Sequence, residues 1–106
     1  MTISLANDIA DKLLPDARKW VRRSSAKLDD EIRQTIAACV LDMRNAGIIK
    51  IAADDPLIQQ AAKLYLKAQF GYDDKSEKWM AAYEHLKAAL SLSSEYTSPA
   101  GDTGGG

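Results

Sequence analysis

Reactive side chains are scarce in this sequence of 106 residues. It has one cysteine, Cys39, so neither an intramolecular disulfide nor a cysteine-based zinc site can form. It has one histidine, His85, so any Cys-His or Ser-His catalytic pair must include that residue. The glycines form no phosphate-binding motif. We therefore expect a protein that is not an enzyme and that carries no metal and no cofactor.

Long apolar runs are also missing. The first twenty residues, MTISLANDIADKLLPDARKW, are interrupted by Asn7, Asp8, Asp11 and Lys12, and contain no apolar stretch of signal-peptide or membrane-spanning length. The chain is 46% hydrophobic and 27% charged, with a formal net charge of -1. A charge near zero disfavours a general nucleic-acid coat. We expect a soluble, intracellular protein with no membrane partner.

The N-terminal half predicts helices. Residues 4–14 carry apolar side chains at helical spacing, and Pro15 is expected to end this helix or to restart it as a short segment over residues 15–24. A longer helix is predicted from Leu28 to Ala46, with a single apolar stripe. Gly47 follows it as a C-terminal stop.

The C-terminal half predicts a hairpin of two helices. Asp55 and Pro56 are typical of a helix start, and this helix runs to Phe70 and is closed by Gly71. Asp74, with Glu77 three residues later, resembles a capping box that begins the second helix. The short connection predicts antiparallel packing. The side chains expected between the two helices are Leu64, Tyr65, Phe70, Trp79, Tyr83 and Leu86.

Two segments lie outside these helices. Residues 48–54 are expected as a short extended piece or a packed loop, because Ile48, Ile49 and Ile51 are β-branched. The segment after Leu92 is rich in Ser, Gly and Pro, and is predicted to bury too little to order itself. The predicted fold is a compact all-α bundle of about four helices over residues 1–96, with a flexible Gly-rich tail over residues 97–106.

Acidic residues cluster where helices are predicted to start. The clusters are Asp29-Asp30-Glu31, Asp54-Asp55 and Asp73-Asp74. Capping and helix-dipole effects, worth about 0.5–2 kcal/mol per cap, explain these clusters without a metal or an acid-base pair. Cys39 lies on an apolar stripe and is expected to act as a small hydrophobe. His85 is expected to face solvent or a partner.

One basic cluster stands out between residues 16 and 27. Five basic side chains stand there against a single acidic one, Asp16, which gives a net charge of +4. The basic residues are Arg18, Lys19, Arg22, Arg23 and Lys27. This basic patch is either a solvated face, or a surface that meets DNA or the acidic helix starts of a neighbouring copy. Complementary patches on different faces of one subunit favour head-to-tail rings.

Two stretches of the chain resemble a known family. The run DPLIQQAAKLYLKAQFGYDDKSEKWMAAYEHLKAALSLSSEY, residues 55–96, resembles the C-terminal part of small phage head-tail connector proteins. These proteins, often described as DNA-packaging proteins, occur in tailed phages and prophages of Gram-positive bacteria. The run LLPDARKWVRRSSAKLDDEIRQTIAACVLDMRNAGI, residues 13–48, resembles their N-terminal half. The order AQFGYDD, YEHLK and LSLSSEY is the most specific part of the resemblance.

The resemblance implies an all-α adaptor of the virion neck that has no catalytic residues and is made in the host cytoplasm. Its copies would form a ring on the portal protein, dodecameric to match it. The ring would extend or close the DNA exit channel after packaging, and would dock the next neck or tail-completion protein. The alternative is a small helical regulator that binds nucleic acid through the basic patch, and an enzyme is the least supported reading.

In the connector setting, three groups of residues are candidate contacts. The basic patch from Arg18 to Lys27 would face the portal, a neighbouring copy or DNA passing through the channel. Tyr72, Asp73 and Asp74 on the hairpin turn are candidate contacts with a partner. The segment with Ile48, Ile49 and Ile51, together with the C-terminal tail, is a candidate for ordering on assembly.

Overall fold

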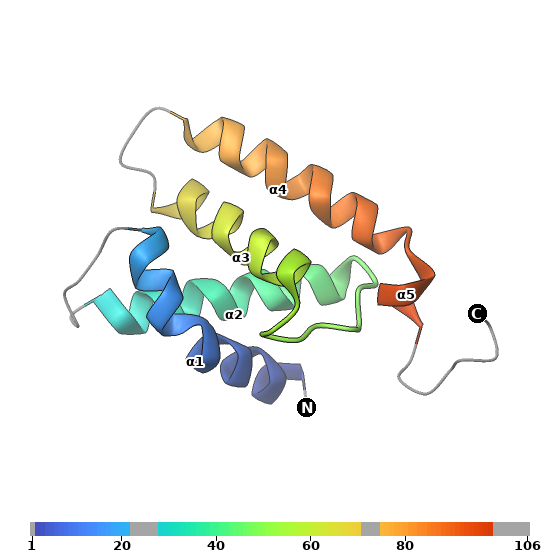
Figure 1. The fold of residues 1–106 in the computed structure, drawn as a ribbon, viewed down its shortest axis with the longest axis horizontal. Coiled ribbons are helices and arrows are strands. Elements are labelled where there is room, and N and C mark those ends of the chain that lie inside the picture. Colours follow the sequence, from blue (N-terminus) through green and yellow to red (C-terminus); the bar gives the residue numbers. More distant parts are fainter. Residues whose placement is uncertain (1, 22–27, 71–74, 99–106) are drawn as a thin grey trace.

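The protein is an all-α bundle. The computed structural model describes residues 2–21, 28–70 and 75–98, which contain five helices and no strand (Figure 1). The helices are α1 (Thr2–Trp20), α2 (Asp29–Asn45), α3 (Pro56–Gln69), α4 (Ser76–Ser91) and α5 (Ser94–Thr97). The predicted fold class is therefore confirmed.

The helices form two layers that share one core. α1 packs along α2, while α3 crosses this pair and contacts both helices. α4 packs antiparallel to α3 on its outer side, and α5 follows at the end of α4 (Figure 1). α2 supplies the centre of the core through its predicted apolar stripe. Its buried residues are Ile32, Ile36, Cys39, Val40 and Met43.

α1 continues through Pro15, so the prediction that this proline ends or restarts the helix is wrong. Proline removes one backbone hydrogen bond and crowds the preceding turn. Pro15 itself is exposed, but Leu13, Leu14 and Ala17 beside it are buried. The ribbon of α1 bends along its length (Figure 1). This bend keeps one apolar stripe against α2 on both sides of the proline, and that burial offsets the lost hydrogen bond.

α2 ends as the sequence predicts. Gly47 has a φ of 97°, a conformation that is strained for residues with a side chain. The amide of Gly47 donates to the carbonyl of Arg44 at 3.0 Å, and the amide of Ile48 donates to that of Met43 at 3.1 Å. These two bonds satisfy carbonyl groups at the helix end and turn the chain into the core.

The segment after Gly47 is a packed loop, which confirms one of the two alternatives. Ile48 is fully buried and Ile51 is 7% exposed. The amides of Ile49 and Lys50 both donate to the carbonyl of Tyr96, at 2.8 and 3.0 Å. The loop is thus bonded to the C-terminal end of the chain.

The prediction that the chain after Leu92 does not order itself is wrong for the stretch up to Ser98. Ser94–Thr97 form α5, and Tyr96 is 8% exposed. The Tyr96 hydroxyl donates to the Asp55 carboxylate, with an O–O distance of 2.9 Å to Oδ2. Tyr96 orders a segment that is otherwise polar, because its ring is buried, its hydroxyl has one hydrogen-bond partner and its backbone carbonyl has two. Residues 99–106 lie outside the described residues.

The α3–α4 hairpin packs through its aromatic residues, as predicted. The Tyr65 and Tyr83 rings meet edge to face with centroids 4.9 Å apart, and the Lys67 ammonium lies 4.8 Å from the Trp79 ring centroid. Asp55 caps α3 by accepting a 2.8 Å hydrogen bond from the amide of Leu57. α4 begins at Ser76 with Lys75 at its N-cap, one position later than expected. Gly71 and Asp74 lie outside the described residues.

Candidate interaction surfaces

Only part of the predicted basic patch falls within the described residues. Arg18 donates from Nε to Asp29 at 2.9 Å, and from Nη2 to the second oxygen of the same carboxylate. The hydrogen bond from Arg18 lowers the pKa of Asp29 below its ordinary value. Lys19 is exposed at the end of α1. Arg22, Arg23 and Lys27 lie outside the described residues, so the role of the patch stays a prediction.

The bidentate pair between Arg18 and Asp29 joins the end of α1 to the start of α2. Capping and helix-dipole effects were expected to explain Asp29, and the ion pair with Arg18 shows that this account is incomplete. A similar correction applies to Asp55, which caps α3 and also accepts from Tyr96. Both carboxylates serve a local helix end and a contact that is distant in sequence.

The other two groups of predicted contacts differ in how far the structure describes them. Tyr72, Asp73 and Asp74 lie outside the described residues. Ile48 and Ile51 are already buried in the single chain, so their part in assembly stays a prediction. Lys50 is exposed and Ile49 is half-buried.

A polar cluster that the sequence analysis missed lies between α2 and α4. The Asp42 carboxylate accepts a 2.6 Å hydrogen bond from the Tyr83 hydroxyl and a 2.8 Å hydrogen bond from the Lys87 ammonium. Burial alone would raise the pKa of Asp42, but the hydrogen bonds from Lys87 and Tyr83 outweigh it and lower the pKa. The sequence carried one sign of this cluster: Tyr83 and Lys87 are four residues apart, so they lie on one face of α4 and can reach the same partner.

Cys39 and His85 sit in opposite environments. Cys39 is fully buried, and burial raises the pKa of its thiol to about 12. The thiol is therefore protonated at neutral pH and is a poor nucleophile, as expected of a structural cysteine. His85 is exposed on α4.

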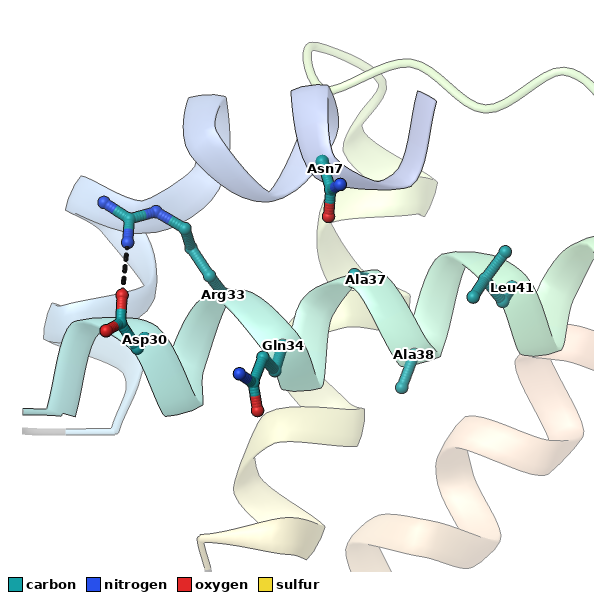
Figure 2. Close-up of a pocket in the computed structure, with 7 residues that line it drawn as sticks. All are labelled: Asn7, Asp30, Arg33, Gln34, Ala37, Ala38 and Leu41. Carbon is teal, nitrogen blue, oxygen red and sulfur yellow. Dashed lines mark hydrogen bonds and ion pairs between the residues drawn. The ribbon is translucent and has the colours of Figure 1, made fainter. Parts of the chain in front are cut away.

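A shallow groove runs along α1 and α2 on the side of α2 that faces away from α3 (Figure 2). Its volume is about 380 Å³. Asn7 of α1 forms one wall, and the other lining residues belong to α2. They are Asp30, Arg33, Gln34, Ala37, Ala38 and Leu41. Arg33 closes one end, because it bonds both Asp30 and Asp11 at 2.9 Å.

Three large apolar side chains are exposed among the described residues. Ile3 near the start of α1 is 67% exposed, Leu57 in the first turn of α3 is 43% exposed, and Leu92 after α4 is 87% exposed. Leu92 is the most exposed of the three. Isolated exposed apolar side chains are common on soluble proteins, so only their surroundings give them meaning.

The comparisons with known proteins identify the family. A family model described as "Phage connector protein" matches residues 13–97. The chain belongs to the phage connector protein family. The matched residues run from within α1 to the end of α5. The resemblance inferred from the sequence is therefore confirmed at the level of the family. No curated protein and no solved structure matches the chain.

Membership in this family supports a structural role as a connector in a bacteriophage particle, in the neck and in contact with portal and neck proteins as a class. No described helix is both long enough and apolar enough to cross a membrane. Within the described ranges, no three metal-ligating side chains converge on one point.

Proposed function

We propose that this protein assembles as a ring on the portal, where it extends or closes the DNA exit channel after packaging and docks the next neck or tail-completion protein. The observation that carries the proposal is the family match over residues 13–97, which runs from within α1 to the end of α5. A dodecameric ring that matches the portal belongs to this proposal. DNA then passes through the channel of this ring.

The test uses DNA-filled heads that carry a portal but were produced without this gene. Purified protein is added, and the heads are imaged by electron microscopy and assayed for tail joining. We expect added density at the portal vertex and recovery of tail joining. Folded protein that leaves the vertex empty would contradict the proposal and would favour the nucleic-acid-binding alternative.

The basic patch is a separate part of the proposal. Arg18 is neutralised by Asp29, so the charge that meets the portal, a neighbour or DNA must come from the rest of the patch. Reversing the charge of Arg22 and Arg23 together is expected to weaken head binding at least about tenfold at low salt, because surface electrostatics is screened by salt. The matched control reverses Lys63, a basic residue of α3. Unchanged binding by the double variant would remove the patch from the interface.

A further inference from the structure

We propose that the outer face of α4 in one copy docks into the α1–α2 groove of a second copy, in a head-to-tail contact. This inference rests on the proposed function, because it names the surfaces through which copies of the connector join. The groove is the set of residues in Figure 2, and the α4 face is defined next.

The α4 face is a continuous exposed stripe. Its residues recur every three or four positions, the spacing of one helix face. They are Lys78, Ala81, His85, Ala88 and Leu92, and all five are exposed. α4 lies at the edge of the molecule, with α3 on its inner side (Figure 1). The stripe is apolar in its second half and ends in Leu92, which is 87% exposed.

The groove has the complementary shape. Ala37 and Ala38 are short, so the surface of α2 is hollow between the longer side chains of Gln34 and Leu41. Figure 2 shows Asn7 reaching down from α1 toward this hollow. A hollow lined by two alanines and a partly exposed leucine accommodates a projecting apolar side chain, and Leu92 is the most exposed large one among the described residues.

Charge selects the orientation of the contact. Asp30 is 86% exposed at the N-terminal end of the groove, and Arg33 is shared between Asp30 and Asp11, so one carboxylate is in excess. Lys78 is exposed at the N-terminal end of the α4 face. When the two helices run parallel, Lys78 meets Asp30 and Leu92 meets Leu41, which pairs opposite charges at one end and apolar groups at the other.

The spacing of these pairs is compatible with the register. At about 1.5 Å per residue, Asp30 and Leu41 are roughly 16 Å apart along α2, and Lys78 and Leu92 are roughly 21 Å apart along α4. The difference is about one helical turn. The long, flexible Lys78 side chain spans it.

A second copy fits these surfaces better than an unrelated partner, because both halves of the contact are present on this chain. The groove and the α4 face belong to different layers (Figures 1 and 2). One such contact leaves a second groove and a second α4 face unoccupied. Further copies therefore add in the same way, and the chain of copies becomes a ring where the rotation closes.

The test blocks each surface separately. Ala38→Arg fills the groove, and Leu92→Asp places a charge on the α4 face; both positions are exposed, so the fold is retained. Matched controls are Gln60→Arg on the exposed side of α3 and Leu57→Asp, at an exposed apolar position of α3 that belongs to neither surface. We expect either blocking variant to lose self-association at least about tenfold in sedimentation velocity, and to lose ring density on portal-bearing heads. The controls should behave as the wild type.

Mixing the two blocking variants gives the sharper result. The Leu92→Asp copy keeps an intact groove and the Ala38→Arg copy keeps an intact α4 face, so the mixture should form a one-to-one complex that grows no further. Absence of this complex at millimolar protein would overturn the inference. If both variants still fill the portal vertex, the interface is wrong while the connector role stands. If the wild type does not bind heads, the connector role fails and the mixing result alone decides the interface.

Discussion

At the scale of the residue, Asp42 connects two helices that otherwise meet little. It accepts from the Tyr83 hydroxyl at 2.6 Å and from the Lys87 ammonium at 2.8 Å. Tyr83 is fully buried, while the Asp42 side chain is 39% exposed. The ring of Tyr83 also packs against Tyr65. Tyr83 therefore combines the packing of α4 on α3 with a hydrogen bond to α2.

Replacing Tyr83 with Phe should lower the free energy of unfolding by about 1–2 kcal/mol, because a hydrogen bond to a carboxylate is lost while the ring stays in place. Urea denaturation followed by circular dichroism measures this change. The matched control is Tyr65→Phe, whose hydroxyl bonds no described residue, with an expected change within about 0.5 kcal/mol. An equal loss of unfolding free energy in the two variants would show that the hydrogen bond from Tyr83 to Asp42 does not stabilise the fold.

At the scale of the element, α1 tolerates an interior proline. Pro15 is exposed, and the stripe on either side of it is buried against α2. Pro15→Ala restores the missing backbone donor and should raise the free energy of unfolding by about 1–2 kcal/mol. Thermal and urea denaturation measure the gain, with the neighbouring exposed Asp16→Ala as control. A loss of stability would mean that the bend at Pro15 is needed for packing on α2.

α5 is a short element that is held to distant parts of the chain mainly by Tyr96, with a longer ion pair between Glu95 and Lys50 at 3.9 Å. Tyr96 accepts from the amides of Ile49 and Lys50 and donates to Asp55, which also caps α3. α5 thereby holds the loop after α2 against the start of α3. This explains how a helix of four residues orders at the end of the chain.

Ending the chain at Ser93 should lower the free energy of unfolding by about 2–4 kcal/mol, because a buried aromatic ring and its hydrogen bonds are lost. It should also accelerate hydrogen exchange at the amides of Ile49 and Lys50. The matched control ends the chain at Ser98 and keeps every contact described for α5. If both truncations have the same effect, Tyr96 does not hold the loop.

At the scale of the whole molecule, two carboxylates with lowered pKa values join helices. Asp29 bonds Arg18 of α1, and Asp42 bonds α4. The pKa of each lies below the ordinary value of 3.8. A carboxylate whose pKa is lower in the folded state stabilises the fold above its unfolded pKa. That contribution is lost as the pH falls through the folded pKa.

The wild type should therefore lose stability between about pH 5 and pH 2 more steeply than Asp29→Asn or Asp42→Asn, which lack one of these carboxylates. Urea denaturation at pH 7 and at pH 3 measures the difference. Asp54→Asn, at an exposed position, is the control and should keep the wild-type pH dependence. Parallel curves for all four proteins would show that the two pairs contribute nothing to acid sensitivity.

Local signals predicted most of the helices and the aromatic packing of the α3–α4 hairpin, and missed the polar contacts between separate helices. Gly47 and Asp55 fall where a left-handed residue and an N-cap are required, so the ends they mark were predictable. Pro15 misled the prediction, because the cost of a proline is local while the burial that offsets it involves α2. The order of the segment around Tyr96 was also mispredicted, because the hydrogen-bond partners of Tyr96 lie more than forty residues earlier in the chain.

The all-α class, the apolar stripe of α2, the aromatic packing of the α3–α4 hairpin and the resemblance to phage connectors could all be predicted from the order of residues alone. Each of these depends on residue types at short, regular spacing, which a linear pattern retains. Only the tertiary structure decided that Arg18 is neutralised by Asp29, that Tyr96 orders α5, and that a groove lies along α1 and α2. These features arise from side chains brought together from separate helices, and the free energy of such contacts depends on the packed geometry.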